Sequence, residues 1–409
     1  MRRSIMILTA AALAIPLAAC GGGQTTGAGG SPSPSASKAG GTLTVWVDDT
    51  RGPAVRAAAT RFEKETGATV RLVQKNFDDI RPDFLAQVPT GKGPDLTVGA
   101  HDWLGEFIAN GVVAPVELGN KATTFEDVAL KAFTYNGQVY GLPYAIENVA
   151  LIRNAALTTT VPKTFDEMIA AGKKAGTKYP FLIQISETGD PYTMYPFQTS
   201  FGAPVFKANP DGSYTSQLTM GGPKGNAFAQ WLARAGKAGT LNTAWTYDIV
   251  VEAFAKGQSP YLVGGPWMLD QFKDMKLAID PIPSAGGQPS RPFTGVQGFY
   301  VSARSQNQVL ATDFLVNYLA TKDAQLALYR AGHRTPALTA AADEVATDPI
   351  AAGFRTVGEN ALPMPSIPEM GAVWNYWGVT EANIISGSLA PVAGWEKMIS
   401  DIQGAIAKG

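Results

Sequence analysis

An alternation of β-forming and helix-forming segments is the feature that most constrains how this chain can fold. Runs of β-forming residues occupy 42–47, 68–73 and 95–98, and apolar residues recur at helical spacing after Pro53 and after Phe77. Strands that alternate with helices in this way are typical of a parallel sheet covered on both faces. The alternation therefore predicts an α/β fold with a mostly parallel sheet flanked by helices.

The same mixture of strands and helices continues through the rest of the chain. Residues 165–174 are predicted to be a helix, with Thr164 as its N-cap and Glu167 as the capping-box partner. The helix expected between the second and third strands is predicted to break near Pro82, and 312–331 is predicted to be one long helix. A length of 409 residues suits two domains. Because no second low-complexity linker is present, ordered crossings are expected to join them.

The first residues of the chain have the features of an export signal. Two arginines precede a short apolar run at 5–17, and small residues then lead to Cys20, the only cysteine. This pattern resembles a bacterial lipobox, which implies a signal peptide over 1–19 and a lipid on the Cys20 sulfur. A plain secretory signal with a chance cysteine, or an uncleaved anchor, is the alternative. Residues 20–41 are rich in Gly, Ser, Thr, Pro and Ala and are predicted to be a flexible tether that places the folded part outside the membrane.

The charge balance and the scarcity of metal-binding residues exclude several functions. Basic and acidic residues number 33 and 34, so the chain has no strong field with which to hold nucleic acid. Only two histidines are present, His101 and His333, which argues against a metal site. His101 is interpreted as a structural hydrogen-bonding residue, and no cofactor is expected.

Charged and aromatic residues follow two of the predicted strands. Asp48, Asp49 and Arg51 come directly after the strand at 42–47, and Asp102 follows the strand at 95–98. Ligands of open α/β sheets bind at the carboxyl ends of strands. Carboxylates accept hydrogen bonds from sugar hydroxyls, and flat aromatic rings cover the C–H faces of pyranoses. The alternative is that these aspartates are turn residues or helix caps.

Further candidates for the same chemistry lie later in the chain. Glu147 lies in an otherwise apolar stretch, so it is expected to have a partner, either a ligand or a structural arginine. Asp190 and Tyr192 join an acceptor to an aromatic ring in a loop. Trp267 lies on a glycine-rich turn, and Trp374 lies in an aromatic cluster. Core packing is the alternative for each aromatic, and it is favoured for the two that follow Trp374.

These segments, taken in order, resemble the maltose-binding protein branch of the extracellular solute-binding proteins of ABC sugar importers. The resemblance covers nearly all of 41–409. It rests on Val45-Trp46, Phe62-Glu63-Lys64-Glu65-Thr66-Gly67, Gly93-Pro94-Asp95, Ala100-His101-Asp102, Tyr135-Asn136-Gly137, Gly265-Pro266-Trp267, Gln288-Pro289-Ser290-Arg291-Pro292-Phe293 and Met364-Pro365-Ser366-Ile367-Pro368. It implies two α/β lobes joined by a multi-strand hinge. The implied lobes are residues 42–145 with 298–336, and residues 146–297 with 337–409.

The resemblance also implies which residues contact the sugar. Carried over by position, the contacts fall on Arg51, Asp102, Glu147, Tyr192, Trp267 and Trp374, with Asp48, Asp78, Asp79 and Asp190 as further candidates. Three departures from the family pattern are Thr50 in place of an acidic residue, Gly99 in place of an aromatic and Trp103 in place of an arginine. A basic residue could also come from the loop at 333–335. The departures leave maltotriose, trehalose and cyclic glucans open as ligands beside maltose.

The expected function is capture of an oligosaccharide, a maltose- or maltodextrin-type α-glucoside, in a cleft between the lobes. The expected protein is a monomer without catalytic activity, anchored to the outer face of the membrane through Cys20. The sugar would favour a hinge-closed state, which the permease subunits of an ABC transporter would recognise. Two alternatives remain open. One is an exported glycoside hydrolase, which also needs paired carboxylates. The other is a polyamine-binding protein on the same fold.

Overall fold

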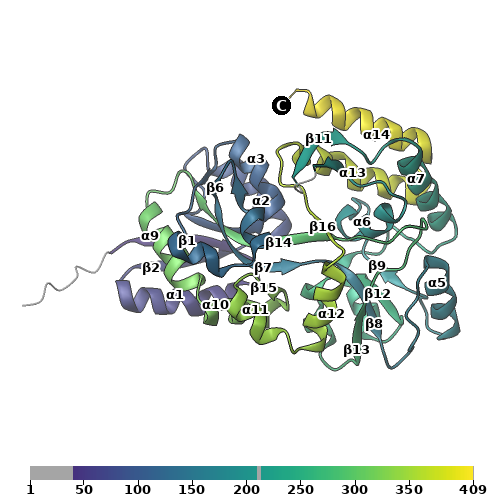
Figure 1. Cartoon of the computed structure of the whole chain (residues 1–409), viewed down its shortest axis with the longest axis horizontal. Helices are drawn as coiled ribbons and strands as arrows, with labels where there is room; N and C mark the ends of the chain where they lie inside the picture. Colours follow the sequence, from purple (N-terminus) through teal and green to yellow (C-terminus); the bar gives the residue numbers. More distant parts are fainter. Residues whose placement is uncertain (1–39, 210–212, 409) are drawn as a thin grey trace, which may run out of the picture. The chain divides into compact units, whose positions relative to one another are not determined.

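The computed structural model describes residues 40–209 and 213–408 of the chain (Figure 1). The predicted signal peptide, Cys20 and the predicted tether up to residue 39 lie outside the described residues. Within the described ranges, no helix combines the length and the apolar character that crossing a bilayer requires.

The larger sheet follows the order β15-β7-β14-β3-β1-β2, and β4 and β16 also pair with β14. Its strands are β1 (Thr42–Val47), β2 (Thr69–Gln74), β3 (Leu96–Ala100), β4 (Val113–Ala114), β7 (Gly141–Glu147), β14 (Phe293–Ser302), β15 (Thr335–Pro336) and β16 (Leu362–Pro363). The first three strands pair in parallel, as the sequence predicts, and β1 lies between β2 and β3.

The smaller sheet follows the order β13-β8-β12-β9. Its strands are β8 (Ala150–Asn154), β9 (Leu182–Ile183), β12 (Tyr261–Gly264) and β13 (Leu277–Asp280). Two hairpin-like pairs, β5 (Thr134–Tyr135) with β6 (Gln138–Val139) and β10 (Phe206–Ala208) with β11 (Tyr214–Leu218), lie apart from both sheets.

The expectation of mostly parallel sheets is wrong, because both sheets are mixed. Strand β14 is antiparallel to β3 and to β7, and β8 is antiparallel to β12 and β13. The local βαβ pattern predicted the parallel half of the larger sheet correctly. The antiparallel strands come from distant parts of the chain, which enter the sheet in the opposite direction and leave no local signal of their orientation.

Helices surround both sheets. Those of the first half are α1 (Gly52–Thr66), α2 (Phe77–Gln87), η1 (His101–Trp103), α3 (Leu104–Ala109), η2 (Gly119–Thr124), α4 (Asp127–Ala132), α5 (Phe165–Lys174) and α6 (Pro191–Ser200). Those of the second half are α7 (Gly222–Lys237), α8 (Tyr247–Ala255), η3 (Pro266–Phe272), α9 (Gln308–Asp313), η4 (Phe314–Leu319), α10 (Lys322–Gly332), α11 (Thr339–Val345), α12 (Pro349–Gly358), α13 (Glu369–Ile385) and α14 (Pro391–Ile406).

Local signals placed several helix ends correctly, but two predictions about continuity are wrong. Helix α5 has the predicted capping box between Thr164 and Glu167. Helix α2 continues through Pro82, because a proline removes one helical hydrogen bond without having to end the helix. The predicted long helix at 312–331 is interrupted by the π-helix η4. A new helix starts after Thr321, whose hydroxyl accepts a hydrogen bond from the amide of Ala324 at 3.3 Å.

Two separate hydrophobic cores form around the two sheets, and β7 and β14 lie between them (Figure 1). Residues up to Ala145 pack in the first core, residues from Val149 to Phe293 pack in the second, and residues from Val296 to Val345 pack in the first again. The chain thus changes core within a few residues of Glu147. Beyond the implied third boundary at residue 336, Val345 packs in the first core and Phe354 packs in the second. All three lobe boundaries stay predictions.

Candidate functional site

Three neighbouring strands place Arg334, Glu147 and Gly295 in one row where the chain passes between the cores. In the sheet register Gly295 pairs with Glu147, and Thr335 pairs with Ile146, so Arg334 comes beside Glu147. The Arg334 guanidinium donates to Glu147 Oε2, and both side chains are buried. Glu147 therefore has the structural arginine that its apolar surroundings called for.

A second buried ion pair lies at the carboxyl end of β1. Asp48 accepts the backbone amide of Arg51 at 2.8 Å and also binds the Arg51 guanidinium. That guanidinium donates further to the Tyr144 hydroxyl, and it lies 4.6 Å from the centre of the Phe77 ring. Burial lowers the pKa of Arg51, and the interactions of the guanidinium with Tyr144 and Glu147 oppose this effect. The structure thus brings Asp48 and Arg51 together, while Asp49 is exposed.

Aromatic rings from the second core face this polar row. The Arg334 guanidinium carbon lies 5.5 Å from the centre of the Trp267 ring, and Tyr192 lies 6.1 Å from Trp267 between ring centres. The Tyr192 hydroxyl is buried and has no hydrogen-bond partner among the described residues. A Cβ at Gly295 would lie 3.0 Å from that hydroxyl and 3.1 Å from Glu147 Cγ. The missing side chain at Gly295 thus leaves room for the phenol beside the carboxylate.

Trp374 and Asp102, both predicted ligand contacts, are hydrogen-bonded to each other. The Trp374 indole donates to Asp102 Oδ2 at 2.9 Å. Burial raises the pKa of Asp102, against the opposing effect of nearby positive charge. His101 is structural as predicted, since its two ring nitrogens face the backbone of Val296 at 3.0 Å and the Met364 carbonyl at 2.9 Å.

The remaining predicted contacts lie near this group without joining its hydrogen bonds. Asp78 and Asp79 are exposed in the first turn of α2. Asp190 caps α6 by accepting the amide of Thr193 at 3.1 Å, so the alternative interpretation as a helix cap applies to it. Burial raises the pKa of Asp190 to about 6, opposed by the hydrogen bonds from Thr193, while the charge of Asp78 raises it further.

Three members of the polar group were missed as site residues or only noted in passing. Gln297 and Tyr144 bind Arg51 from the two crossing strands, and Arg334 binds Glu147. Tyr144 and Gln297 lie beside implied lobe boundaries, and Arg334 lies in the loop at 333–335 that was named as a source of a basic residue. The polar side chain of Gln297 in a strand that is otherwise largely apolar was the signal available in the sequence. Glu381 was not foreseen either; it is buried on α13, with one carboxyl oxygen that has no partner among the described residues.

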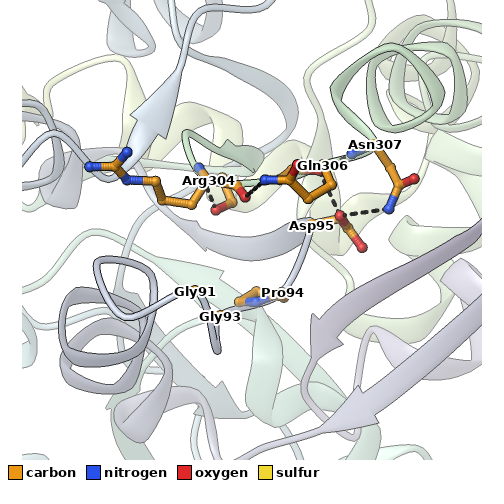
Figure 2. A pocket seen from close by; sticks show the side chains of 9 residues that line it. Gly91, Gly93, Pro94, Asp95, Arg304, Gln306 and Asn307 are labelled. Carbon is orange, nitrogen blue, oxygen red and sulfur yellow. Dashed lines mark hydrogen bonds between the residues drawn. The ribbon is translucent and has the colours of Figure 1, made fainter. Parts of the chain in front are cut away.

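A small polar hollow lies elsewhere, on the first core. Its volume is about 130 Å³, and it is lined by residues of 91–95 and 302–307 (Figure 2). Asp95 at its edge accepts hydrogen bonds from Ser305 at 2.6 Å and from Asn307 at 3.3 Å, so its carboxylate is occupied by the chain itself. None of the predicted ligand contacts lines this hollow. Within residues 40–209 and 213–408, no three His, Cys, Asp or Glu side chains gather as metal ligands would.

Comparison with known proteins adds independent evidence. Residues 57–353 match the model of a family described as bacterial extracellular solute-binding protein. The chain is 30% identical to a maltodextrin-binding protein of Bacillus subtilis over 91% of this chain and 90% of that protein. It is 26% identical to a galactooligosaccharide-binding protein of the same organism over 99% and 97%. Its structure is similar to that of a Thermus thermophilus maltotriose binding protein bound with maltotriose, with a TM-score of 0.81, 32% identity and coverage of 89% of this chain and 100% of that one.

Proposed function

Because this chain belongs to the family of bacterial extracellular solute-binding proteins, we propose that it captures a maltodextrin-type α-glucan and delivers it to an ABC importer. The proposal extends to the ligand what the relatives' names say of those proteins. The galactooligosaccharide-binding relative makes a galactooligosaccharide the second candidate.

The observation that carries the proposal is the unpartnered hydroxyl of Tyr192. A buried polar group without a hydrogen bond is costly, and a ligand hydroxyl would satisfy it. The charges of Glu147 and Asp102 are close enough to the phenol to raise its pKa beyond the effect of burial, so acceptors for further sugar hydroxyls surround it. Trp267 and Tyr192 supply ring faces for pyranose C–H groups. Together these groups match a neutral, polyhydroxylated ring.

The mechanism follows from the origin of the contacts. Asp102 and Arg51 belong to elements of the first core, whereas Tyr192, Trp267 and Trp374 pack against the second. A saccharide that touches both sets favours the state in which the two cores are drawn together. The permease subunits would then recognise that closed state, and no bond of the sugar is made or broken.

The location of the protein is part of the proposal. A lipid on Cys20 would hold the chain at the outer face of the cell membrane, and residues 20–41 would act as its tether. Metabolic labelling with a fatty-acid analogue tests this directly, with Cys20→Ser as the control. Equal labelling of the two chains would exclude Cys20 as the lipid site.

The ligand is tested by titration calorimetry against maltotriose, maltose, trehalose, a galactooligosaccharide and spermidine. We expect maltotriose to bind and spermidine not to bind. Trp267→Ala is expected to weaken maltotriose binding by about tenfold or more, because a stacking ring is lost from the contact. Trp245→Phe, a change in the second core, should lower the melting temperature and leave the affinity unchanged.

Three outcomes would contradict the proposal. Binding of spermidine alone would point to a polyamine receptor. Preferential binding of the galactooligosaccharide would move the ligand to the second candidate. Chromatography of the products would identify a glycoside hydrolase if it showed that maltotriose is converted to shorter sugars at a catalytic rate.

A further inference from the structure

Gln297 lies between the two buried ion pairs, Asp48–Arg51 and Glu147–Arg334, and its side chain bonds to one member of each. It is 4% exposed and lies on β14. Its side-chain oxygen accepts from the Arg51 guanidinium at 3.1 Å, and its side-chain nitrogen donates to Glu147 Oε1 at 2.7 Å. One amide therefore connects a cation and a carboxylate that come from separate segments of the chain.

The chemistry of its neighbours leaves this amide one orientation. A guanidinium only donates hydrogen bonds and a carboxylate only accepts them. The amide oxygen must therefore face Arg51 and the amide nitrogen must face Glu147. A reversed amide would lose both bonds, because its N–H groups would face the donors of Arg51 and its oxygen would face the carboxylate of Glu147. Each of these two partners also binds a second charged side chain, since Asp48 binds Arg51 and Arg334 binds Glu147.

The neutrality of Gln297 preserves the charge balance of this buried group. Asp48 and Glu147 supply two negative charges, and Arg51 and Arg334 supply two positive charges. An acid of the same size at position 297 would add a third negative charge next to Glu147. Two carboxyl groups at hydrogen-bond distance share a proton rather than ionise together.

We propose that Gln297 is a positioning residue that holds Arg51 and Glu147 in the arrangement in which they meet the ligand. This inference rests on the proposed function. Gln297 need not touch the saccharide itself. Its amide sets the direction in which the remaining lone pairs of Glu147 and the remaining N–H groups of Arg51 point.

The test compares Gln297→Glu with wild type by measuring the Kd for maltotriose at pH 5 and at pH 8. At pH 5 a shared proton lets the new acid imitate the amide, so binding should be close to that of wild type. At pH 8 loss of that proton leaves two facing carboxylates. Relative to wild type at each pH, affinity should then fall by about tenfold or more between pH 5 and pH 8. The titratable and charged groups around position 297 are Asp48, Arg51, His101, Asp102, Tyr144, Glu147, Tyr192 and Arg334. Burial lowers the pKa of His101.

Gln325→Glu is the matched control. Gln325 is also buried, and its side chain bonds to the backbone of Pro143 and of Leu338 rather than to the ion pairs. This variant should have the pH dependence of wild type. A loss of affinity in Gln297→Glu that is the same at both pH values would overturn the inference, because it would report general damage to packing.

A second variant keeps the inference testable if Gln297→Glu does not fold. Gln297→Met keeps the volume and removes both hydrogen bonds. Its affinity for maltotriose should be about tenfold weaker at both pH values. Affinity equal to that of wild type would show that neither bond positions anything. If wild type itself binds none of the sugars tested, the proposed function fails, and this outcome is distinct from failure of the role of Gln297.

Discussion

At the scale of single residues, Glu147 shows what the sequence can predict about a buried side chain and what it cannot. Its place in an apolar stretch predicted that it must have a partner, and it has two, Gln297 and Arg334. The partners themselves could not be predicted, since they lie 150 and 187 residues away along the chain. Local patterns identify a side chain that needs an unusual environment, but only the fold determines what supplies that environment.

Arg334 is expected to be necessary for stability as well as for the site. Arg334→Met leaves the buried carboxylate of Glu147 without its cation. Loss of one member of a buried ion pair costs about 3 kcal/mol or more of unfolding free energy. Urea denaturation in the absence of sugar measures this loss. Lys397→Met, which breaks the exposed pair with Asp401 on α14, should leave the unfolding free energy nearly unchanged.

Asp190 predicts a dependence of stability on pH. Its pKa rises from 3.8 to about 6 in the folded chain because it is buried. Between those values the folded state binds more protons than the unfolded state, so unfolding free energy decreases as pH rises. Burial also raises the pKa of Glu381 well above its ordinary range, and the charge of Asp190 adds to this.

Thermal unfolding of wild type and of Asp190→Asn, from pH 4 to pH 7, tests this dependence. Asparagine keeps the helix cap and does not titrate. Wild type should lose stability relative to the variant as pH rises to about 6. The opposite trend would show that Asp190 is stabilised as a carboxylate in the folded chain.

At the scale of helices and strands, local signals succeeded where one short segment decides the structure. The capping box of Thr164 and the parallel strands β1 to β3 were predicted from neighbouring residues alone. The antiparallel entry of β14 was not, because its partners lie in distant segments. The restart of the helix after Thr321 was missed because apolar spacing continues across it, although a threonine cap was a readable signal.

The cap of α5 offers a direct measurement of one such local signal. Thr164→Ala removes the acceptor for the amide of Glu167 and should lower the unfolding free energy by about 1 kcal/mol. Thr60→Ala, on the exposed face of α1, is the control. Its hydroxyl only bonds back to the Arg56 carbonyl, so alanine should be neutral or slightly stabilising there. Equal losses in the two variants would mean that the cap contributes nothing beyond the side chain itself.

At the scale of the whole molecule, two apolar cores meet at a strip of buried polar groups. The crossing strands β7 and β14 each place one such group, Glu147 and Gln297, at the passage between the cores. Apolar packing thus stabilises each core separately, whereas directional bonds specify how the crossing segments register with one another. The resemblance implied where the chain passes from one lobe to the other. The bonds of Gln297 and the pair of Glu147 with Arg334 could not be predicted, because their members are distant in sequence.

A ligand that contacts both cores should protect both from opening. At about 100 times its Kd, maltotriose should add about 2.7 kcal/mol to the unfolding free energy. Hydrogen exchange should slow in β1 of the first core and in β12 of the second together. Slowing in only one of these strands would show that the sugar is held by one core and does not couple them.

The bare backbone of Gly295 leaves the space in which the Tyr192 hydroxyl lies beside Glu147. A single methyl group there would reach the Tyr192 hydroxyl and the Glu147 stem at 3.0 and 3.1 Å. Alanine would therefore press on the phenol and on the stem of the carboxylate, so one of these two side chains would have to move. Because Tyr192 and Glu147 are both proposed ligand contacts, a change at this one glycine would alter ligand binding without replacing any residue that touches the ligand.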